Sequence, residues 1–241
     1  MTAALLLHRA GSALPSTNFR IGTFGTTDPF AGVREIAWEG PGSMCAGRVS
    51  FGGELDVGHY PHTETIVVVD GELSLHATGG SPLVLRCGEG AVIARGTSVG
   101  IKAASGTQFV FCAAAAEGAG QPGVTRLCAD ADFKPSNPPP AEVLLGPTPQ
   151  CRSDNVFTDE QSQYRAGTWD STPYHRVSRP HRLNEFMYLL EGGVRFASPD
   201  GSVLSTSPGD ALFVPQGAPV GWESSERVAK IYVVQEVPAQ N

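Results

Sequence analysis

The sequence predicts an all-β protein built from two tandem β-barrels, and three observations carry this prediction. Short apolar segments are separated by Gly, Pro and Asp at regular spacing, which is typical of strands joined by tight turns. The 29 glycines and 19 prolines fit many such turns, and no long amphipathic pattern indicates a helix. The 241 residues leave room for two domains of roughly 100 residues each.

The chain is expected to divide into four parts. Residues 1–20 show little periodicity and predict an irregular arm. An N-terminal barrel is expected over 21–116, covered at its edge by residues 33–38. Residues 117–149 are rich in Ala, Gly and Pro, and they predict an extended linker because Pro cannot pair within a central strand. A C-terminal barrel is expected over 150–238.

An internal repeat relates the two predicted barrels. Seven positions separate Glu64 from Gly71, and seven separate Glu185 from Gly192. From each of these glycines to the next turn glycine, 71 to 88 and 192 to 209, there are 17 positions. Anchors that keep one register over this length are hard to obtain by chance, so the halves are expected to share one fold.

Composition and charge exclude several classes of protein. The formal net charge of −7 argues against general nucleic-acid binding, which needs a basic surface. No stretch approaches the ~20 apolar residues of a membrane span. The five cysteines form no C-x-x-C pair and are odd in number, which favours reduced thiols in a cytoplasmic protein. Cys87 and Cys112 lie in apolar segments and are expected to be buried.

The order of short motifs in the second half resembles that of the cupins, which are small jelly-roll barrels. The motifs are Gly167-x-Trp169, Asn184-Glu185, Glu191-Gly192, Gly209-Asp210, Pro215-x-Gly217, Trp222 and Lys230-x-Tyr232. Together they are similar to the subgroup that includes (S)-ureidoglycine aminohydrolases and ethanolamine-utilisation cupins. With the repeat, the resemblance implies a bicupin of two double-stranded β-helix barrels. It also implies an enzyme that acts on a polar, nitrogen-containing or carboxylate metabolite.

The common cupin metal site takes two His, a Glu and a further His after the Pro-x-Gly turn, a donor set suited to Mn, Fe, Zn or Ni. In the second barrel, Glu185 and His181 match two of these positions. Arg179 and Val220 stand at the other two. His181 and Glu185 are therefore metal candidates. Arg179 is expected either to form a charge-assisted network with them or to clamp a carboxylate-bearing ligand.

In the first barrel, Glu64 matches the acid position, while Gly58, Tyr60 and Val99 replace the histidines. His59 and His62 lie close to Glu64 in sequence, so a metal site formed by His59, His62 and Glu64 is a further alternative. A metal in either barrel, or no metal at all, is compatible with these residues.

Two functions follow as hypotheses. In the first, Glu64 or Glu185 has a pKa raised by an apolar barrel and acts as general acid or base, with His62 assisting. Tyr60, Arg179 and Trp222 would contact the substrate, and the reaction would be a hydrolysis, isomerisation or elimination. In the second, the chain binds a small ligand without catalysis, because Val99 and Val220 replace the last metal ligand in both barrels. The sequence leaves open whether the protein is a monomer or a homodimer.

Overall fold

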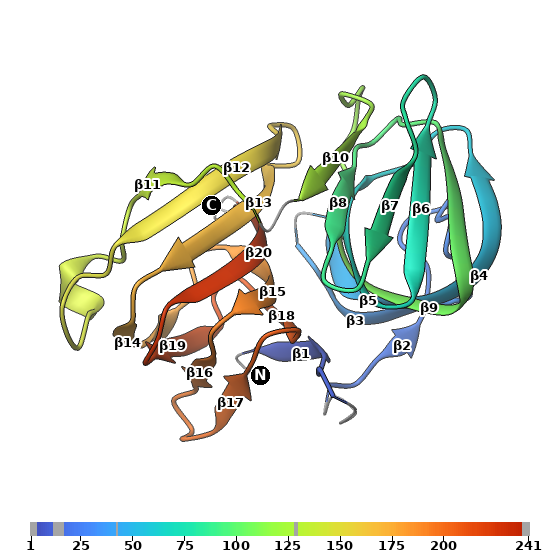
Figure 1. Ribbon diagram of the computed structural model, residues 1–241. Coiled ribbons are helices and arrows are strands. Elements are labelled where there is room, and N and C mark those ends of the chain that lie inside the picture. Colours follow the sequence, from blue (N-terminus) through green and yellow to red (C-terminus); the bar gives the residue numbers. More distant parts are fainter. Residues whose placement is uncertain (1–3, 12–16, 42, 128–129, 238–241) are drawn as a thin grey trace. The chain divides into compact units, whose positions relative to one another are not determined.

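A computed structural model describes residues 4–11, 17–41, 43–127 and 130–237, and these residues form an all-β protein, as predicted (Figure 1). Their only helical element is one 3-10 turn, η1 (Ala141–Val143). No helix in this part of the chain is long and apolar enough to cross a membrane. Residues 1–3 and 12–16 of the predicted arm, and Cys128, lie outside the described residues.

The chain forms two compact units. The first unit contains described residues within 16–128 and 156–165, and the second contains those within 1–15, 129–155 and 166–241. The predicted linker 117–149 is not wholly irregular, because it contains two short strands. These are β10 (Val124–Leu127), which pairs with β8 in the first unit, and β11 (Lys134–Ser136), which pairs with β12 in the second.

The first unit is a strongly bent sheet that closes around an apolar core. Its strands follow the order β10-β8-β5-β9-β4-β3-β2, with β6 and β7 added beside β9. One end of β9 pairs with β6 and the other end pairs with β5, so this strand carries the bend of the sheet. The core includes Ile66, Phe109 and Phe111. The strands are β2 (Arg20–Ile21), β3 (Arg34–Gly40), β4 (Met44–Val57), β5 (Thr63–Asp70), β6 (Glu72–Ala77), β7 (Leu83–Arg86), β8 (Gly90–Ile93) and β9 (Val99–Ala114).

The second unit contains two sheets, except that the ends of β12 and β13 within residues 156–165 belong to the first unit. One has the order β1-β18-β15-β20-β13-β12-β11, and the other has the order β14-β19-β16-β17. Met187, Leu212 and Trp222 belong to its core. The strands are β1 (Leu5–His8), β12 (Cys151–Asp159), β13 (Tyr164–Ser171), β14 (Tyr174–Pro180), β15 (Asn184–Glu191), β16 (Val194–Ala197), β17 (Val203–Thr206), β18 (Ala211–Val214), β19 (Pro219–Ser224) and β20 (Val228–Gln235).

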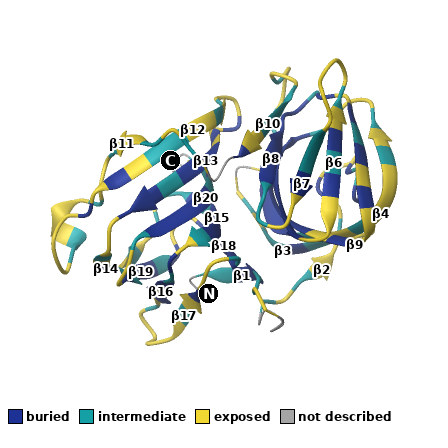
Figure 2. Cartoon of the chain, in the orientation of Figure 1, coloured by how far each residue is buried: buried dark blue, intermediate teal, exposed yellow. Residues whose placement is uncertain are grey.

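The predicted irregular arm contains a strand, which corrects the sequence interpretation. β1 pairs with β18, and Leu6 and Leu7 are buried against the second unit (Figure 2). Asp210 anchors the end of this strand by accepting hydrogen bonds from the Arg9 guanidinium and the Ala10 amide. The apolar LLL segment is too short to show a period, so only the pairing reveals the strand.

The internal repeat is visible in the strand register. Glu64 on β5 lies opposite β8 and β9, and Glu185 on β15 lies opposite β18 and β20. The six turn glycines at 71, 88, 96, 192, 209 and 217 all have φ between 69° and 89°. This left-handed conformation strains residues with a Cβ, so the glycines of the repeat mark equivalent turns.

The cysteines follow the prediction only in part. Cys112 is buried, as expected, whereas Cys87 is exposed. Cys87 immediately precedes Gly88, which has a positive φ, so it lies at the turn between β7 and β8 rather than inside a strand.

Candidate functional site

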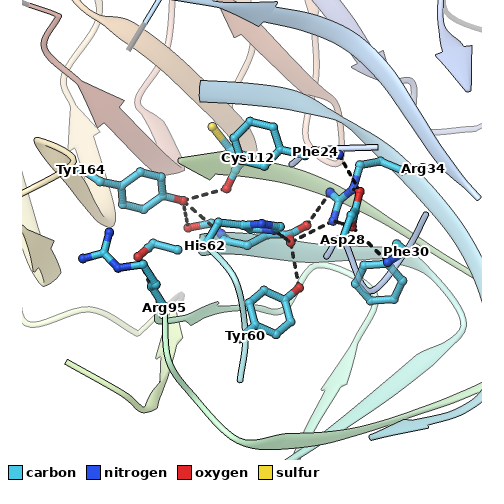
Figure 3. Close-up of polar contacts among 12 residues, drawn as sticks. Phe24, Asp28, Phe30, Arg34, Tyr60, His62, Arg95, Cys112 and Tyr164 are labelled. Atoms are coloured by element: carbon cyan, nitrogen blue, oxygen red, sulfur yellow. Dashed lines mark hydrogen bonds and ion pairs between the residues drawn. The ribbon is translucent and has the colours of Figure 1, made fainter. Parts of the chain in front are cut away.

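Glu64 lies in a closed network of buried charges in the first unit (Figure 3). From the start of β3, Arg34 donates from Nη1 to one carboxylate oxygen at 2.9 Å and from Nη2 to the other at 3.1 Å. The Tyr60 hydroxyl donates to Oε2 at 2.8 Å, and His62 Nε2 lies 2.8 Å from the same oxygen. Both oxygens of Glu64 therefore have partners from the protein.

Arg34 is held between two carboxylates. Its Nε and Nη2 donate to Asp28 at 2.7 and 2.8 Å, and its guanidinium lies 4.2 Å from the centre of the Phe111 ring. Asp28 also accepts the backbone amides of Phe24 and Phe30. The side chains of Arg34, Asp28 and Glu64 are completely buried. Every charge in this network is thus paired, as buried charges need to be.

The electrostatics of Glu64 differ from the prediction. Burial alone would raise the pKa of its carboxyl group, but the Arg34 charge and the His62 hydrogen bond lower it to about 2. Burial and the neighbouring Glu64 charge raise the pKa of Tyr60 well above its ordinary value. The expected raised pKa of Glu64 was wrong because sequence spacing alone did not reveal that Arg34 reaches it. Glu64 is ionised at neutral pH and is closed off from solvent.

The structure does not bring together the three residues of the metal site that was considered for the first barrel, His59, His62 and Glu64. His59 is exposed in the segment before β5, while His62 and Glu64 are buried and contact each other. Tyr60, expected to contact substrate, is fully buried with its hydroxyl on Glu64.

In the second unit, Glu185 pairs with two basic side chains and remains in reach of solvent. Lys230 Nζ donates to Oε1 at 2.7 Å, and His181 Nε2 lies 2.7 Å from Oε2. The side chains of Glu185 and His181 are 14% and 12% exposed, whereas Glu64 has no exposure. His181 Nδ1 is buried and has no hydrogen-bond partner among the described residues.

The pKa of Glu185 also moves opposite to the prediction. Burial alone would raise it, but the Lys230 charge and the His181 hydrogen bond hold it well below its ordinary value. Glu185 is therefore a carboxylate at neutral pH. Because a carboxylate accepts hydrogen bonds, His181 Nε2 carries a proton and donates it to Glu185.

A bulge brings two arginines to one face of β14. Arg176 lies opposite Trp222 and Arg179 lies opposite Val220, with a shift in register between them. The three residue positions from Arg176 to Arg179 on β14 therefore pair with only two positions on β19, from Trp222 to Val220. Side chains three residues apart normally point to opposite faces of a strand, and one extra residue restores the same face. Val220 and Trp222 are both buried, so this is the inner face.

The two arginines have no charge partner among the residues that the structure describes. Arg176 is 7% exposed and makes one long hydrogen bond, from Nη2 to the Val220 carbonyl at 3.4 Å. The Nε atoms of Arg176 and Arg179 are buried without partners in the described part of the chain. Burial raises the pKa of the nearby Tyr174 hydroxyl, which also feels the charges of Arg176, Glu185 and Arg179. Tyr174, Arg176 and Arg179 all lie on β14 opposite β19.

Aromatic rings enclose the ammonium of Lys230. Its Nζ lies 4.7 Å from the centre of the Trp169 ring and 5.0 Å from that of Trp222. Trp222 stacks on Tyr174, with the ring centres 5.3 Å apart. Such cation–π contacts stabilise the charged form of a lysine. Trp222, expected to contact substrate, is 4% exposed and packs within this aromatic cluster.

The residues around the two glutamates do not fit the predicted metal ion. A metal would need the oxygens that Arg34 and Lys230 occupy, and these two cations already supply the positive charge. Among the described residues, no group of three or more His, Cys, Asp or Glu is arranged to hold a metal. His181 and Glu185 contact each other, but no third such ligand joins them in the described part of the chain.

Sequence reasoning missed Asp28 and Arg34, and it favoured an ion pair for Lys230 without naming Glu185 as the partner. Asp28 and Arg34 precede the recognisable repeat, and Lys230 lies 45 residues after Glu185. Arg176 could have been noticed as a candidate binding residue, since it lies three residues before Arg179 and two after Tyr174. The bulge that aligns the two arginines is not visible in the sequence.

Comparison with known proteins identifies the family. Residues 158–232 match the EutQ-like cupin domain. The crystal structure of a protein of unknown function from Pseudomonas syringae pv. tomato str. DC3000, a member of the DUF861 family, is 42% identical. It superposes with a TM-score of 0.94, covering 97% of this chain and 99% of that one. None of the curated proteins compared with the chain matches it.

More distant structures share the fold alone. A cupin 2 conserved barrel domain protein from Leptotrichia buccalis is 10% identical, with a TM-score of 0.60 over 85% of this chain and 88% of that one. A mutant of salicylate 1,2-dioxygenase from Pseudoaminobacter salicylatoxidans is 12% identical, with a TM-score of 0.51 over 80% of this chain and 71% of that one. Proteins with this cupin fold thus include both enzymes and proteins of unknown function.

Proposed function

The chain belongs to the DUF861 family, and we propose that its second unit binds a small carboxylate-bearing metabolite and accepts a proton from it. The observation that carries the proposal is His181, whose Nδ1 is buried without a partner in the described residues while Nε2 contacts Glu185. A nitrogen left free in this way is available to a bound ligand. The cupin fold alone does not choose between catalysis and binding.

Arg176 and Arg179 supply the binding step. Their Nε atoms are buried and unpaired within the described chain, and an unpaired buried charge is costly. A carboxylate matches the planar guanidinium group and would satisfy its N–H donors. Arg176 lies opposite Trp222, whose ring contacts Lys230, the partner of Glu185. We therefore place a ligand held by the arginines on the side of the unit where Glu185 and His181 lie.

His181 supplies the proton-transfer step. Glu185 fixes the imidazole with its proton on Nε2, which leaves the Nδ1 lone pair to accept a proton from the ligand. The imidazolium that forms would be stabilised by the Glu185 carboxylate. Lys230 balances the charge of Glu185 before the reaction and keeps it ionised. Hydrolysis, isomerisation and elimination each need such a proton acceptor.

The test uses a panel of small 2-oxo, 2-hydroxy and 2-amino carboxylates. Binding is measured by isothermal titration calorimetry, and proton transfer by NMR detection of C–H to C–D exchange in D₂O, with product formation followed in the same samples. We expect His181→Gln to abolish exchange or turnover while binding changes little. Glu185→Gln should reduce exchange strongly because the imidazole loses its orientation.

His175→Gln is the matched control, since this exposed histidine lies on β14, the strand that ends just before His181. Binding without exchange or turnover for any compound would contradict catalysis and support a ligand-binding protein instead. The panel is run with a chelator and with added Mn, Fe, Zn or Ni. Activity that required one of these ions would reinstate the predicted metal site and refute the metal-free assignment of His181.

A further inference from the structure

The site in the second unit carries an excess of positive charge. Glu185 contributes one negative charge, which the Lys230 ammonium 2.7 Å away balances. Arg176 and Arg179 add two positive charges, and neither forms an ion pair with a carboxylate among the described residues. Leaving His181 aside, the other four side chains together carry a net charge of two positive units.

The surroundings do not neutralise this excess. Asp170, a buried carboxylate of the same unit, already pairs with Arg152 and Arg227. Glu223 on β19 pairs with Arg195 and is exposed. Asp170 and Glu223 therefore have cationic partners other than Arg176 and Arg179.

The strand bulge makes the arrangement specific. It turns Arg176 and Arg179 to the same inner face of β14, opposite the buried residues Trp222 and Val220. Two like charges on one face repel each other, and burial strengthens the repulsion by lowering the effective dielectric constant. A ligand that brings negative charge removes this cost, so the arginine pair favours an occupied site.

Resting on the proposed function, we propose that the ligand is a small dianion with two carboxylate groups. Each arginine presents its own buried, unpaired Nε, and each therefore calls for its own anionic group. Two carboxylates also match the net charge of the site. The bulge thus acts as a specificity device that sets the number of carboxylates in the substrate.

The experiment compares malonate, succinate and glutarate with their monoamides, which keep length and shape but lose one charge. Binding is measured by isothermal titration calorimetry at low ionic strength, because salt screens charge interactions. We expect at least one dicarboxylate to bind about tenfold more tightly than its monoamide, the factor expected of one charge-assisted hydrogen bond. Inorganic phosphate, a compact dianion, is expected to bind more weakly than that dicarboxylate.

Arg179→Gln and Arg176→Gln should each bring the ratio of dicarboxylate to monoamide affinity close to one. Arg195→Gln, which removes the same charge from an exposed position, should leave the ratio unchanged. Circular dichroism verifies folding, and Arg179, being only half-buried, keeps the test available if the Arg176 variant unfolds.

Two outcomes separate the proposals. The proposal of a dicarboxylate ligand would be overturned if wild-type protein bound a dicarboxylate and its monoamide with equal affinity, or bound phosphate more tightly. Either result would leave the proposal of carboxylate binding intact. Failure of every mono- and dicarboxylate to bind would overturn both.

Discussion

Replacing Glu64 with Gln tests whether the closed network stabilises the first unit through charge. The carboxyl pKa falls from 4.5 to about 2 in the folded protein. A shift of this size corresponds to about 3 kcal/mol at about 1.4 kcal/mol per unit. We expect Glu64→Gln to lower the free energy of unfolding at pH 7 by about this amount. The Gln side chain keeps the shape but leaves Arg34 with a single carboxylate partner.

The pH dependence has a definite sign. Because the folded-state pKa of Glu64 is lowered, its contribution is complete above pH 4.5 and is lost as the pH falls toward 2. The difference in stability between wild-type protein and Glu64→Gln should therefore shrink across this window. Taking the difference between the two proteins cancels titrating groups that both share.

Hydrogen–deuterium exchange of peptides from β5 and β9 reports on the first unit and gives the opening free energy at each pH. Glu72→Gln is the matched control, because the Glu72 side chain is 51% exposed in its pair with Arg86 and should change stability by less than about 0.5 kcal/mol. Equal stability of Glu64→Gln and wild-type protein at pH 7 would refute the reasoning. A difference that stayed constant down to pH 2 would show that shape, and not charge, is responsible.

Three further predictions concern other parts of the chain. Lys230→Met should lower the affinity for carboxylate ligands and raise the pKa of Glu185, because the ammonium that keeps this group ionised is lost. ¹³C NMR of the labelled Glu185 carboxyl group measures the pKa shift, and an unchanged pKa would contradict the ion pair. Asp210→Ala should release β1 from β18, so that limited proteolysis cuts within residues 4–11 well before the rest of the second unit; equal protection in both proteins would contradict the anchor. In the native protein Cys87 should react rapidly with a thiol reagent, whereas buried Cys45, whose pKa burial raises, should react only on unfolding; mass spectrometry of peptides distinguishes the two, and early modification of Cys45 would contradict its burial.

The sequence alone determined the fold class and the repeat. Alternation of apolar residues, and glycines at equivalent turns, are local features that act within a few residues of the chain. They predicted the all-β fold and the equivalent placement of Glu64 and Glu185, which the strand register bears out. The arm was misread because its strand exists only by pairing with β18, a partner more than 200 positions away in sequence.

Only the tertiary structure decided which charge faces each glutamate. Arg34 reaches Glu64 across 30 positions and Lys230 reaches Glu185 across 45, and both reverse the pKa direction that burial alone would produce. The alignment of Arg176 with Arg179 likewise depends on a single extra residue in the pairing of β14 with β19. Electrostatic energies depend on distances in space, and a linear sequence carries those distances only once the strands have paired.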